Sequence, residues 1–175
     1  FAERVVVRAA DFNLVRLPEG VDFVTAAALG CRFATAFHAL TVQSDLAPEQ
    51  WLLVIGCGGV GLSAVLIARA LGARVLAVDP SAAARERALQ LGAEYALETA
   101  EPETVHRLTD GGAHVSLDAV GSAATASAGV YGLRRRGRHV QAGLMLGSNA
   151  HAALPWDRVI AHELSVAGSH GMAAA

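Results

Sequence analysis

The sequence predicts an α/β protein in which helices cover both faces of a parallel sheet. From residue 51 onward, short apolar runs alternate with segments of helical periodicity, and this alternation favours parallel strands joined by helical crossovers. The stretch WLLVIGCGGVGLSAVLIARAL at 51–71 shows the unit most clearly, because an uncharged run meets a glycine turn and then a helical repeat. We therefore expect a doubly wound, six-stranded Rossmann fold, whose ligands lie beyond the carboxyl ends of the strands.

Two further regions are expected ahead of the sheet. Strand pieces are predicted at 3–10 and 13–17, ended by Pro18, and a helical region is predicted at 22–44 with an interruption at Gly30. The strands of the sheet are expected at 51–55, 74–79, 95–97, 115–120, 138–142 and 163–167. Helices are expected between them at 62–71, 81–91, 102–109, 123–133 and 156–161.

Residues typical of helix ends support these boundaries. Gly92 and Gly111 close two of the helices, and Pro102 begins another. The run Arg134-Arg135-Arg136 is expected to form a solvated helix C-terminus, where the helix dipole favours positive charge.

The glycine turn after the first strand predicts a phosphate-binding site. Gly56, Gly58 and Gly61 occupy the fixed places of G-x-G-x-x-G, which allow a sharp turn, close approach of a pyrophosphate and close helix packing. Gly59 and Val60 complete the turn, and the helix that begins here offers free N–H groups to phosphates. Such turns also occur in methyltransferases and in plain structural bends, so the prediction depends on its surroundings.

An acid at the end of the second strand supports dinucleotide binding. Asp79 lies 18 residues after Gly61, where a carboxylate can accept hydrogen bonds from both ribose hydroxyls and repel a 2′-phosphate. The same residue could instead cap the helix that begins near Ser81. Because strand, glycines and acid stand in register, we favour ribose binding and predict NAD over NADP. Arg85 is expected near the ribose rim, so this preference is not absolute.

Two later turns are predicted to lie at the same edge of the sheet. Val120 and Gly121 follow the fourth strand, and Gly143 and Leu144 follow the fifth. The carboxyl ends of parallel strands meet at one edge, so these residues are candidate contacts of the bound cofactor.

Composition excludes several classes of partner and site. The net charge of −2 over 175 residues gives no global attraction to nucleic acid, and no apolar run reaches the ~20 residues of a membrane helix. Two cysteines cannot form a disulfide scaffold. We expect a cytoplasmic protein that needs neither nucleic acid nor membrane. Because the chain begins with Phe1 and not Met, we also expect it to be a piece of a longer protein.

With these pieces in place, the chain resembles the medium-chain dehydrogenase/reductase family, and within it the zinc-dependent alcohol dehydrogenases. The resemblance covers nearly the whole chain. Three patterns support it: LGCRFATAFHAL at 29–40, VIGCGGVG at 54–61 followed by VDPS, and the late strand at 163–169.

The resemblance implies roles for individual residues. Cys31 would be a thiolate ligand of a catalytic zinc, and Thr35 a contact of the nicotinamide near the reacting atoms. Backbone at Val120 and at 143–144 would bracket the carboxamide. Judged without the family, Cys31 would be a small buried apolar residue, and Cys57 is expected to be only the variable position of the glycine turn.

The resemblance also implies what lies outside this chain. The remaining zinc ligands of such enzymes belong to a barrel-like catalytic domain, of which residues 1–21 would be a remnant, with 22–175 forming the cofactor domain. The parent enzyme would transfer hydride between NAD and an alcohol, aldehyde or ketone, and the isolated chain would be nearly inactive. The strand at 163–167 is expected at a sheet edge, where relatives pair, so we predict a homodimer or homotetramer.

Two alternative functions stay open on the sequence alone. An adenosylmethionine-dependent methyltransferase shares the glycine turn and the acid after the second strand, but it needs no cysteine-helix pattern at 29–40. A non-enzymatic nucleotide-sensing module would show ligand-dependent assembly without turnover.

Overall fold

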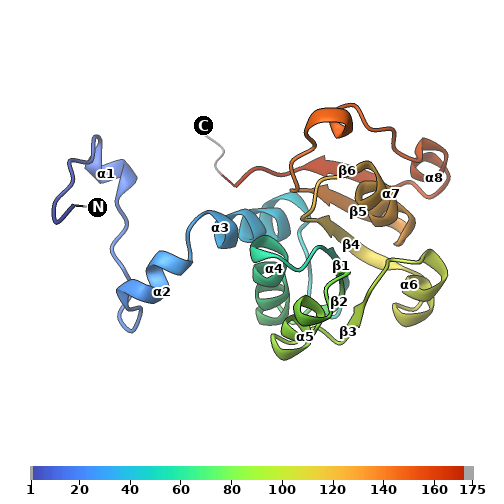
Figure 1. Ribbon diagram of the computed structural model, residues 1–175, viewed down its shortest axis with the longest axis horizontal. Coiled ribbons are helices and arrows are strands. Elements are labelled where there is room, and N and C mark those ends of the chain that lie inside the picture. The colour runs from blue at the N-terminus through green and yellow to red at the C-terminus, as the bar shows by residue number, and fades with distance from the viewer. Residues whose placement is uncertain (1, 172–175) are drawn as a thin grey trace. The chain divides into compact units, whose positions relative to one another are not determined.

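The computed structural model describes residues 2–171 (Figure 1). The chain divides into two compact units, residues 1–30 and 31–175. The assignment of residues 1–21 to a catalytic domain stays a prediction.

The smaller unit contains two short helices, α1 (Ala10–Asn13) and α2 (Phe23–Ala28). Helix α2 begins after Asp22, whose carboxylate accepts a hydrogen bond from the Thr25 N–H at 2.7 Å. This is the arrangement of an N-cap, and it explains why the predicted helical region begins there.

The strand pieces predicted at 3–10 and 13–17 are wrong. The described residues of the smaller unit contain no strand. A strand is stable only beside a hydrogen-bonded neighbour and with one face buried, whereas the side chains of Val6 and Val15 are 94% and 89% exposed. Period-2 apolar residues alone therefore do not make a strand in this segment.

The larger unit is built on a six-stranded parallel sheet, as predicted. In space the order is β3-β2-β1-β4-β5-β6, so the direction of winding reverses between β1 and β4, where ligands of such sheets bind. The strands are β1 (Trp51–Ile55), β2 (Arg74–Val78), β3 (Tyr95–Leu97), β4 (Ala113–Asp118), β5 (Leu133–Gln141) and β6 (Ser165–Gly168).

Helices cover both faces of this sheet (Figure 1). One face carries α3 (Cys31–His38), the π-helical turn η1 (Ala39–Gln43), α4 (Gly59–Ala70) and α5 (Ala82–Gln90). The other carries α6 (Pro102–Leu108), α7 (Ala123–Tyr131) and α8 (Trp156–Ala161), and a short 3-10 turn, η2 (Gly147–Asn149), precedes α8. Among the described residues, no helix combines the length and apolar character needed to cross a bilayer.

The core consists of two layers that share the central strand. Leu52 and Val54 of β1 pack in the layer under α4, while Leu53 and Ile55 pack in the layer under α7. All five residues of β1 are buried. Burial on both faces explains why this strand is a continuous apolar run and not an alternating one.

The predicted helix C-terminus at the arginine run is wrong. Helix α7 ends at Tyr131 with Gly132 as its C-cap, and Arg134, Arg135 and Arg136 lie within β5. The pairing of β5 with β4 shifts register in this stretch, and Arg136 has φ +60°. An irregular strand with a bulge accommodates consecutive charged residues that neither a helical nor a strand period predicts.

Candidate functional site

The glycine turn joins the carboxyl end of β1 to α4. Gly56 has φ +90°, and a Cβ there would lie 2.5 Å from a methyl carbon of Val120. Gly61 packs against the carbonyl oxygen of Gly56 and leaves no room for a side chain. Beside Gly58, the N-cap of α4, the space that a Cβ would enter is open to 4 Å. The backbone beside Gly58 therefore leaves room for a group at the N-terminus of α4, as a pyrophosphate site requires.

Arg32 is a candidate that the sequence analysis missed. Its side-chain stem lies against Gly59, the first residue of α4, and would overlap a Cβ at that position. Arg32 is exposed, so its guanidinium lies close to a helix N-terminus that favours anions. No spacing rule marks this residue, because it belongs to α3 and meets the glycine turn only in the folded chain.

Asp79 is tied to the glycine turn through its carboxylate. Oδ2 accepts a hydrogen bond from the N–H of Cys57 at 2.8 Å, and Oδ1 accepts one from the N–H of Ser81 at 2.8 Å. The N-cap of α5 is Ser81 itself, whose hydroxyl accepts from the N–H of Ala84 at 3.4 Å. Each carboxylate oxygen of Asp79 keeps further acceptor capacity, so the pair can still receive ribose hydroxyls.

Arg85 bonds the backbone of this segment and not the carboxylate of Asp79. Its Nη1 donates to the carbonyl oxygens of Asp79 at 2.8 Å and Pro80 at 2.9 Å, and its Nη2 is 3.6 Å from a carboxylate oxygen of Glu98. These contacts fix the guanidinium of Arg85 beside Asp79 and Pro80, although Arg85 is not among the residues that line the cleft described below.

Cys57 is a buried thiol inside the turn. Burial, and then the charge of Asp79, raise its pKa to about 11. It stays protonated at neutral pH and is unsuited to bind metal or attack a substrate. This agrees with its interpretation as the variable position of the turn.

A cleft of about 580 Å³ opens at this edge of the sheet, from the end of β1 across the ends of β2, β3 and β4. Its size falls within the range of small-molecule and cofactor sites. Gly56, Asp79 and Val120, predicted separately from the sequence, all line it. Its remaining lining residues are Ile55, Val78, Pro80, Glu98, Thr99, Ala100, Glu101, Ala124, Thr125 and Ala128.

The two later turns pack backbone against backbone. Gly121, at φ +92°, lies against the backbone of Gly143 and Leu144, so that a Cβ there would approach within 2.8 Å of the Gly143 carbonyl carbon. Val120 and Leu144 remain 53% and 63% exposed. The pair of turns therefore presents two apolar side chains outward from one rigid backbone junction.

Asp118, which the sequence analysis did not single out, fixes this junction. It is fully buried at the end of β4. Its Oδ1 accepts from the N–H groups of Val120 at 2.7 Å and Gly121 at 3.0 Å, and its Oδ2 accepts from the hydroxyl of Thr125 at 2.9 Å. A buried carboxylate that accepts several hydrogen bonds is compensated for its desolvation. An acid inside an otherwise uncharged predicted strand, two residues before Val120, is the signal that could have identified it.

A second cavity brings Cys31 and Thr35 close to the glycine turn and to the turn after β5. This cavity, of about 220 Å³, is lined by Cys31, Thr35, Val60, Ala142, Leu144, Ser169, His170 and Gly171. Thr35 is 8% exposed, and its hydroxyl donates to the carbonyl oxygen of Cys31 at 2.6 Å. Cys31 is exposed, which differs from the small buried apolar residue expected without the family.

Cys31 alone does not make a metal site in the described part of the chain. Among residues 2–171, no three His, Cys, Asp or Glu side chains are grouped so that they could hold a metal ion. An accessible thiol beside the cofactor edge fits one ligand position of a zinc site, which normally has three or four protein ligands. The structure therefore places a candidate ligand, and its role stays a prediction.

Comparison with known proteins decides the family. A family model for zinc-binding dehydrogenases matches residues 59–175. This range includes most of the sheet and the turns that follow β4 and β5. The chain belongs to the zinc-binding dehydrogenase family. An alcohol dehydrogenase from Thermus sp. ATN1 has the same fold, with a TM-score of 0.83 and 31% identity over 93% of this chain and 48% of that one.

Curated relatives of this zinc-binding dehydrogenase chain are named as alcohol-converting enzymes. A geraniol dehydrogenase of Castellaniella defragrans is 42% identical over 65% of this chain and 32% of its own length. An NAD-dependent alcohol dehydrogenase of Sulfolobus acidocaldarius is 36% identical over 87% of this chain and 44% of its own length. The chain thus spans less than half of either relative. These relatives favour neither a methyltransferase nor a nucleotide-sensing module.

Proposed function

We propose that this chain is the cofactor-binding part of a zinc-dependent alcohol dehydrogenase, which transfers hydride between NAD and an alcohol, aldehyde or ketone. One observation supports the proposal most strongly. The glycine turn, Asp79 and the two later turns share one sheet edge, and the cavity of Cys31 and Thr35 is bounded by Val60 of that turn and by Leu144.

Each part of the edge has a role in the proposal. The N-terminus of α4 and Arg32 would bind the pyrophosphate, and Asp79 would bind the ribose of adenosine. The backbone at Val120 and Leu144 would hold the nicotinamide near Thr35. The fixed turns then supply orientation, which is a large part of what a fold contributes to hydride transfer.

Zinc belongs to the proposal through Cys31. In the parent enzyme, zinc would hold the substrate oxygen and stabilise it as an alkoxide. Cys31 would provide one thiolate at the mouth of the cavity, and the other protein ligands would come from outside the described residues. On this basis the chain alone binds cofactor but turns over little substrate.

Calorimetric titration with NAD and NADP tests the proposal. We expect NAD to bind more tightly, because the carboxylate of Asp79 repels a 2′-phosphate. Equal or tighter binding of NADP would contradict the ribose role of Asp79. Binding of adenosylmethionine in preference to both would replace the dehydrogenase with a methyltransferase.

We also propose that the parent enzyme is a homodimer or homotetramer joined through β6. This strand is the last in the sheet order, and its outer edge has no neighbouring strand among the described residues. An unpaired edge is a ready template for a second copy. Light scattering of the parent enzyme at micromolar concentration tests this, and a monomer would contradict it.

A cytoplasmic location is the remaining proposal. Cys31 and Cys57 are both free thiols, which suits a reducing compartment. Cell fractionation followed by detection of the chain tests the location, and recovery from an oxidising compartment would contradict it.

A further inference from the structure

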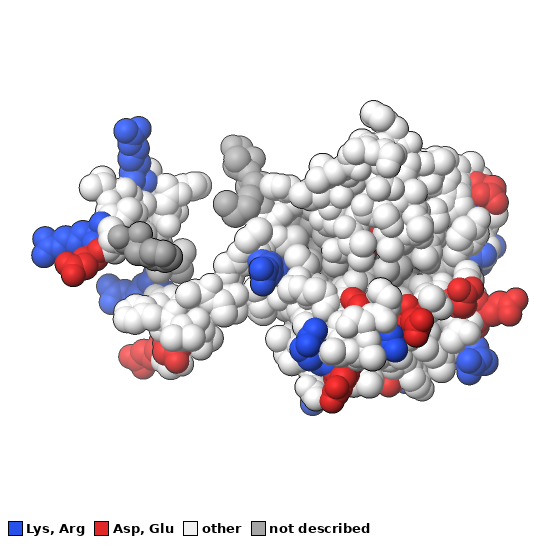
Figure 2. Space-filling model, in the orientation of Figure 1, with Lys and Arg blue, Asp and Glu red and all other residues white. Residues whose placement is uncertain are grey.

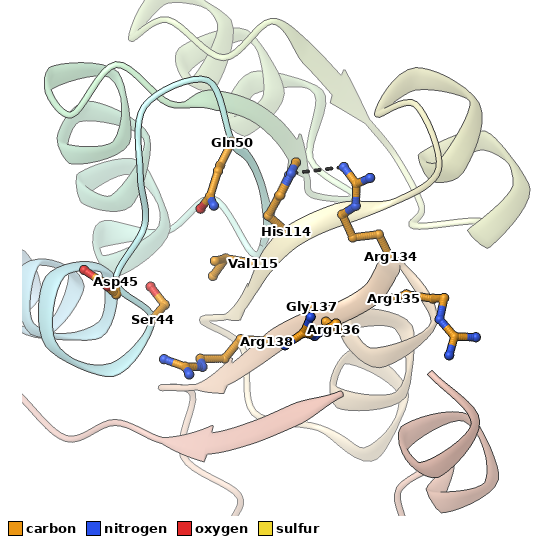
Figure 3. Close-up of a pocket in the computed structure, with 10 residues that line it drawn as sticks. All are labelled: Ser44, Asp45, Gln50, His114, Val115, Arg134, Arg135, Arg136, Gly137 and Arg138. Carbon is orange, nitrogen blue, oxygen red and sulfur yellow. Dashed lines mark hydrogen bonds between the residues drawn. The ribbon is translucent and has the colours of Figure 1, made fainter. Parts of the chain in front are cut away.

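A separate cavity lies at the opposite edge of the sheet from the cofactor cleft (Figure 3). It has a volume of about 470 Å³ and opens where β1, β4 and β5 begin. Because the strands are parallel, the two cavities lie beyond opposite ends of the same strands. Its lining residues are Ser44, Asp45, Gln50, His114, Val115, Arg134, Arg135, Arg136, Gly137 and Arg138.

The lining carries four arginines and one carboxylate, that of Asp45. Figure 3 shows Arg134 directed toward His114, Arg138 directed toward Ser44 on the other side, and Arg135 turned away. Nη1 of Arg138 donates to the carbonyl oxygen of Gln43 at 2.9 Å, so this guanidinium is held at the cavity wall. Positive charge therefore exceeds negative charge around the space.

His114 and Arg134 face each other without an acceptor between them. Its Nδ1 accepts from the N–H of Trp51 at 3.0 Å, and its Nε2 lies 3.0 Å from Nη1 of Arg134. Both neighbours are donors only, whereas a neutral imidazole has one acceptor nitrogen. Because Nδ1 accepts from Trp51, the proton of the neutral ring is on Nε2. The Nε2–H group and the guanidinium of Arg134 are then two donors that face each other. Burial and then the charge of Arg134 lower the pKa of His114, which keeps the ring neutral.

Arg136 adds a charge without a partner in the described part of the chain. It lies at the irregular turn of β5 with φ +60° and is exposed. No described residue within hydrogen-bond or ion-pair distance neutralises it. By contrast, Arg135, which points away, has a carboxylate oxygen of Glu163 at 3.9 Å. Of the four arginines that line the cavity, Arg135 is thus the one with a carboxylate at ion-pair distance among the described residues.

We propose that this cavity binds a small phosphate-bearing anion, such as a phosphate monoester or pyrophosphate, through Arg134, Arg136 and Arg138. A doubly charged oxyanion supplies the acceptors that Arg134 and His114 lack. Guanidinium groups bind phosphate oxygens through paired, charge-assisted hydrogen bonds. The volume of the cavity leaves room for an organic group beyond the phosphate.

The charge distribution favours a small anion over a nucleic acid. The net charge of the chain is −2, and on the face drawn in Figure 2 acidic and basic side chains of the larger unit are interspersed. A nucleic-acid site needs a continuous basic surface that follows the phosphate backbone. The arginines here are grouped within five consecutive positions of one strand.

The experiment is a titration of the isotopically labelled 175-residue chain with sodium pyrophosphate, followed by backbone amide NMR. We expect the amide signals of 134–138 and of His114 to shift together along one binding curve. The same spectra separate this site from the cofactor turn, because pyrophosphate at the turn would shift 56–61 instead. In Arg136→Gln, the dissociation constant for pyrophosphate, measured from the shifts of 134–138, should rise about tenfold.

A matched variant controls for general charge effects. Arg107→Gln removes an exposed arginine of α6 outside the cavity and should leave the curve of 134–138 unchanged. Equal weakening in both variants would overturn the proposal, as would the absence of shifts at 134–138. Tighter binding of succinate than of pyrophosphate, or shifts at 134–138 only with an oligonucleotide, would overturn it too. Failure of NAD binding would leave these spectra unaffected, so the two proposals are tested separately.

Discussion

Replacing Asp79 with Asn is the sharpest test of how the cofactor edge selects its ligand. The substitution keeps the size of the side chain and one acceptor oxygen, and it removes the negative charge. That oxygen can still accept from the buried N–H of Cys57, while the new amide group would face the N–H of Ser81, which lies in an exposed turn and can be hydrated. The fold should therefore survive the change.

The expected loss follows from the bonds that a carboxylate makes to ribose hydroxyls. A hydrogen bond to a charged group contributes about 1.5 to 3 kcal/mol, which corresponds to roughly 10- to 100-fold in affinity. NAD should bind Asp79→Asn more weakly by about this factor. NADP should lose less or gain, because its 2′-phosphate no longer meets a carboxylate and Arg85 remains beside it.

Calorimetry of the variant with both cofactors measures the NAD to NADP ratio directly. Asp110→Asn is the matched control, since Asp110 is an exposed acid at φ +54° in the turn before β4, a conformation that Asn tolerates. The control should keep the original ratio. An unchanged ratio in Asp79→Asn, with the fold intact by circular dichroism, would refute the ribose role.

Three other predictions concern single residues. Mass spectrometry after maleimide treatment at pH 7 should find Cys31 modified and Cys57 unmodified. Cys31 is exposed, whereas Cys57 is buried and its pKa is raised to about 11. Faster reaction at Cys57 would contradict this prediction. Arg32→Gln should weaken NAD about tenfold but leave adenosine unaffected, because only NAD carries the pyrophosphate; equal losses would contradict the contact. Burial lowers the pKa of His139 in the folded chain, so as pH falls this histidine takes up its proton in the unfolded chain before it does so in the folded one. The free energy of unfolding should therefore fall as pH drops through about 6.5. Urea titrations of His139→Gln should show a smaller fall.

The sequence predicted the central elements well because their determinants are local. Strands β1 and β2 are buried on both faces, so they appear as continuous apolar runs between turn residues. Strand β3 and helix α8 match their predicted bounds. The predicted carboxyl edge also brought Gly56, Asp79 and Val120 to one cleft, since in a parallel sheet the strand ends alone determine that arrangement.

What the sequence missed depends on contacts between distant segments. The segments at 3–10 and 13–17 have residues typical of strands, but no described strand pairs with them. The arginine run belongs to β5 because β4 pairs with it, and three adjacent charges show no period of either kind. Arg32 reaches the glycine turn only once α3 packs against α4, and spacing along the chain carries no sign of that contact.

Polar side chains of β4 and β5 hydrogen-bond to the turns that follow these two strands. The hydroxyl of Ser116 lies 2.9 Å from Nδ1 of His139, Nε2 of His139 lies 3.2 Å from Oε1 of Gln141, and Nε2 of Gln141 donates to the carbonyl oxygen of Gly143 at 2.9 Å. One tautomer of His139, with the proton on Nε2, satisfies every step. These successive hydrogen bonds fix the turn after β5, as Asp118 fixes the turn after β4. Apolar residues at these positions would avoid the cost of desolvation but would leave both turns without their anchors. Under the proposed function, these polar side chains would support the two turns that hold the nicotinamide, because hydride transfer depends on a fixed orientation.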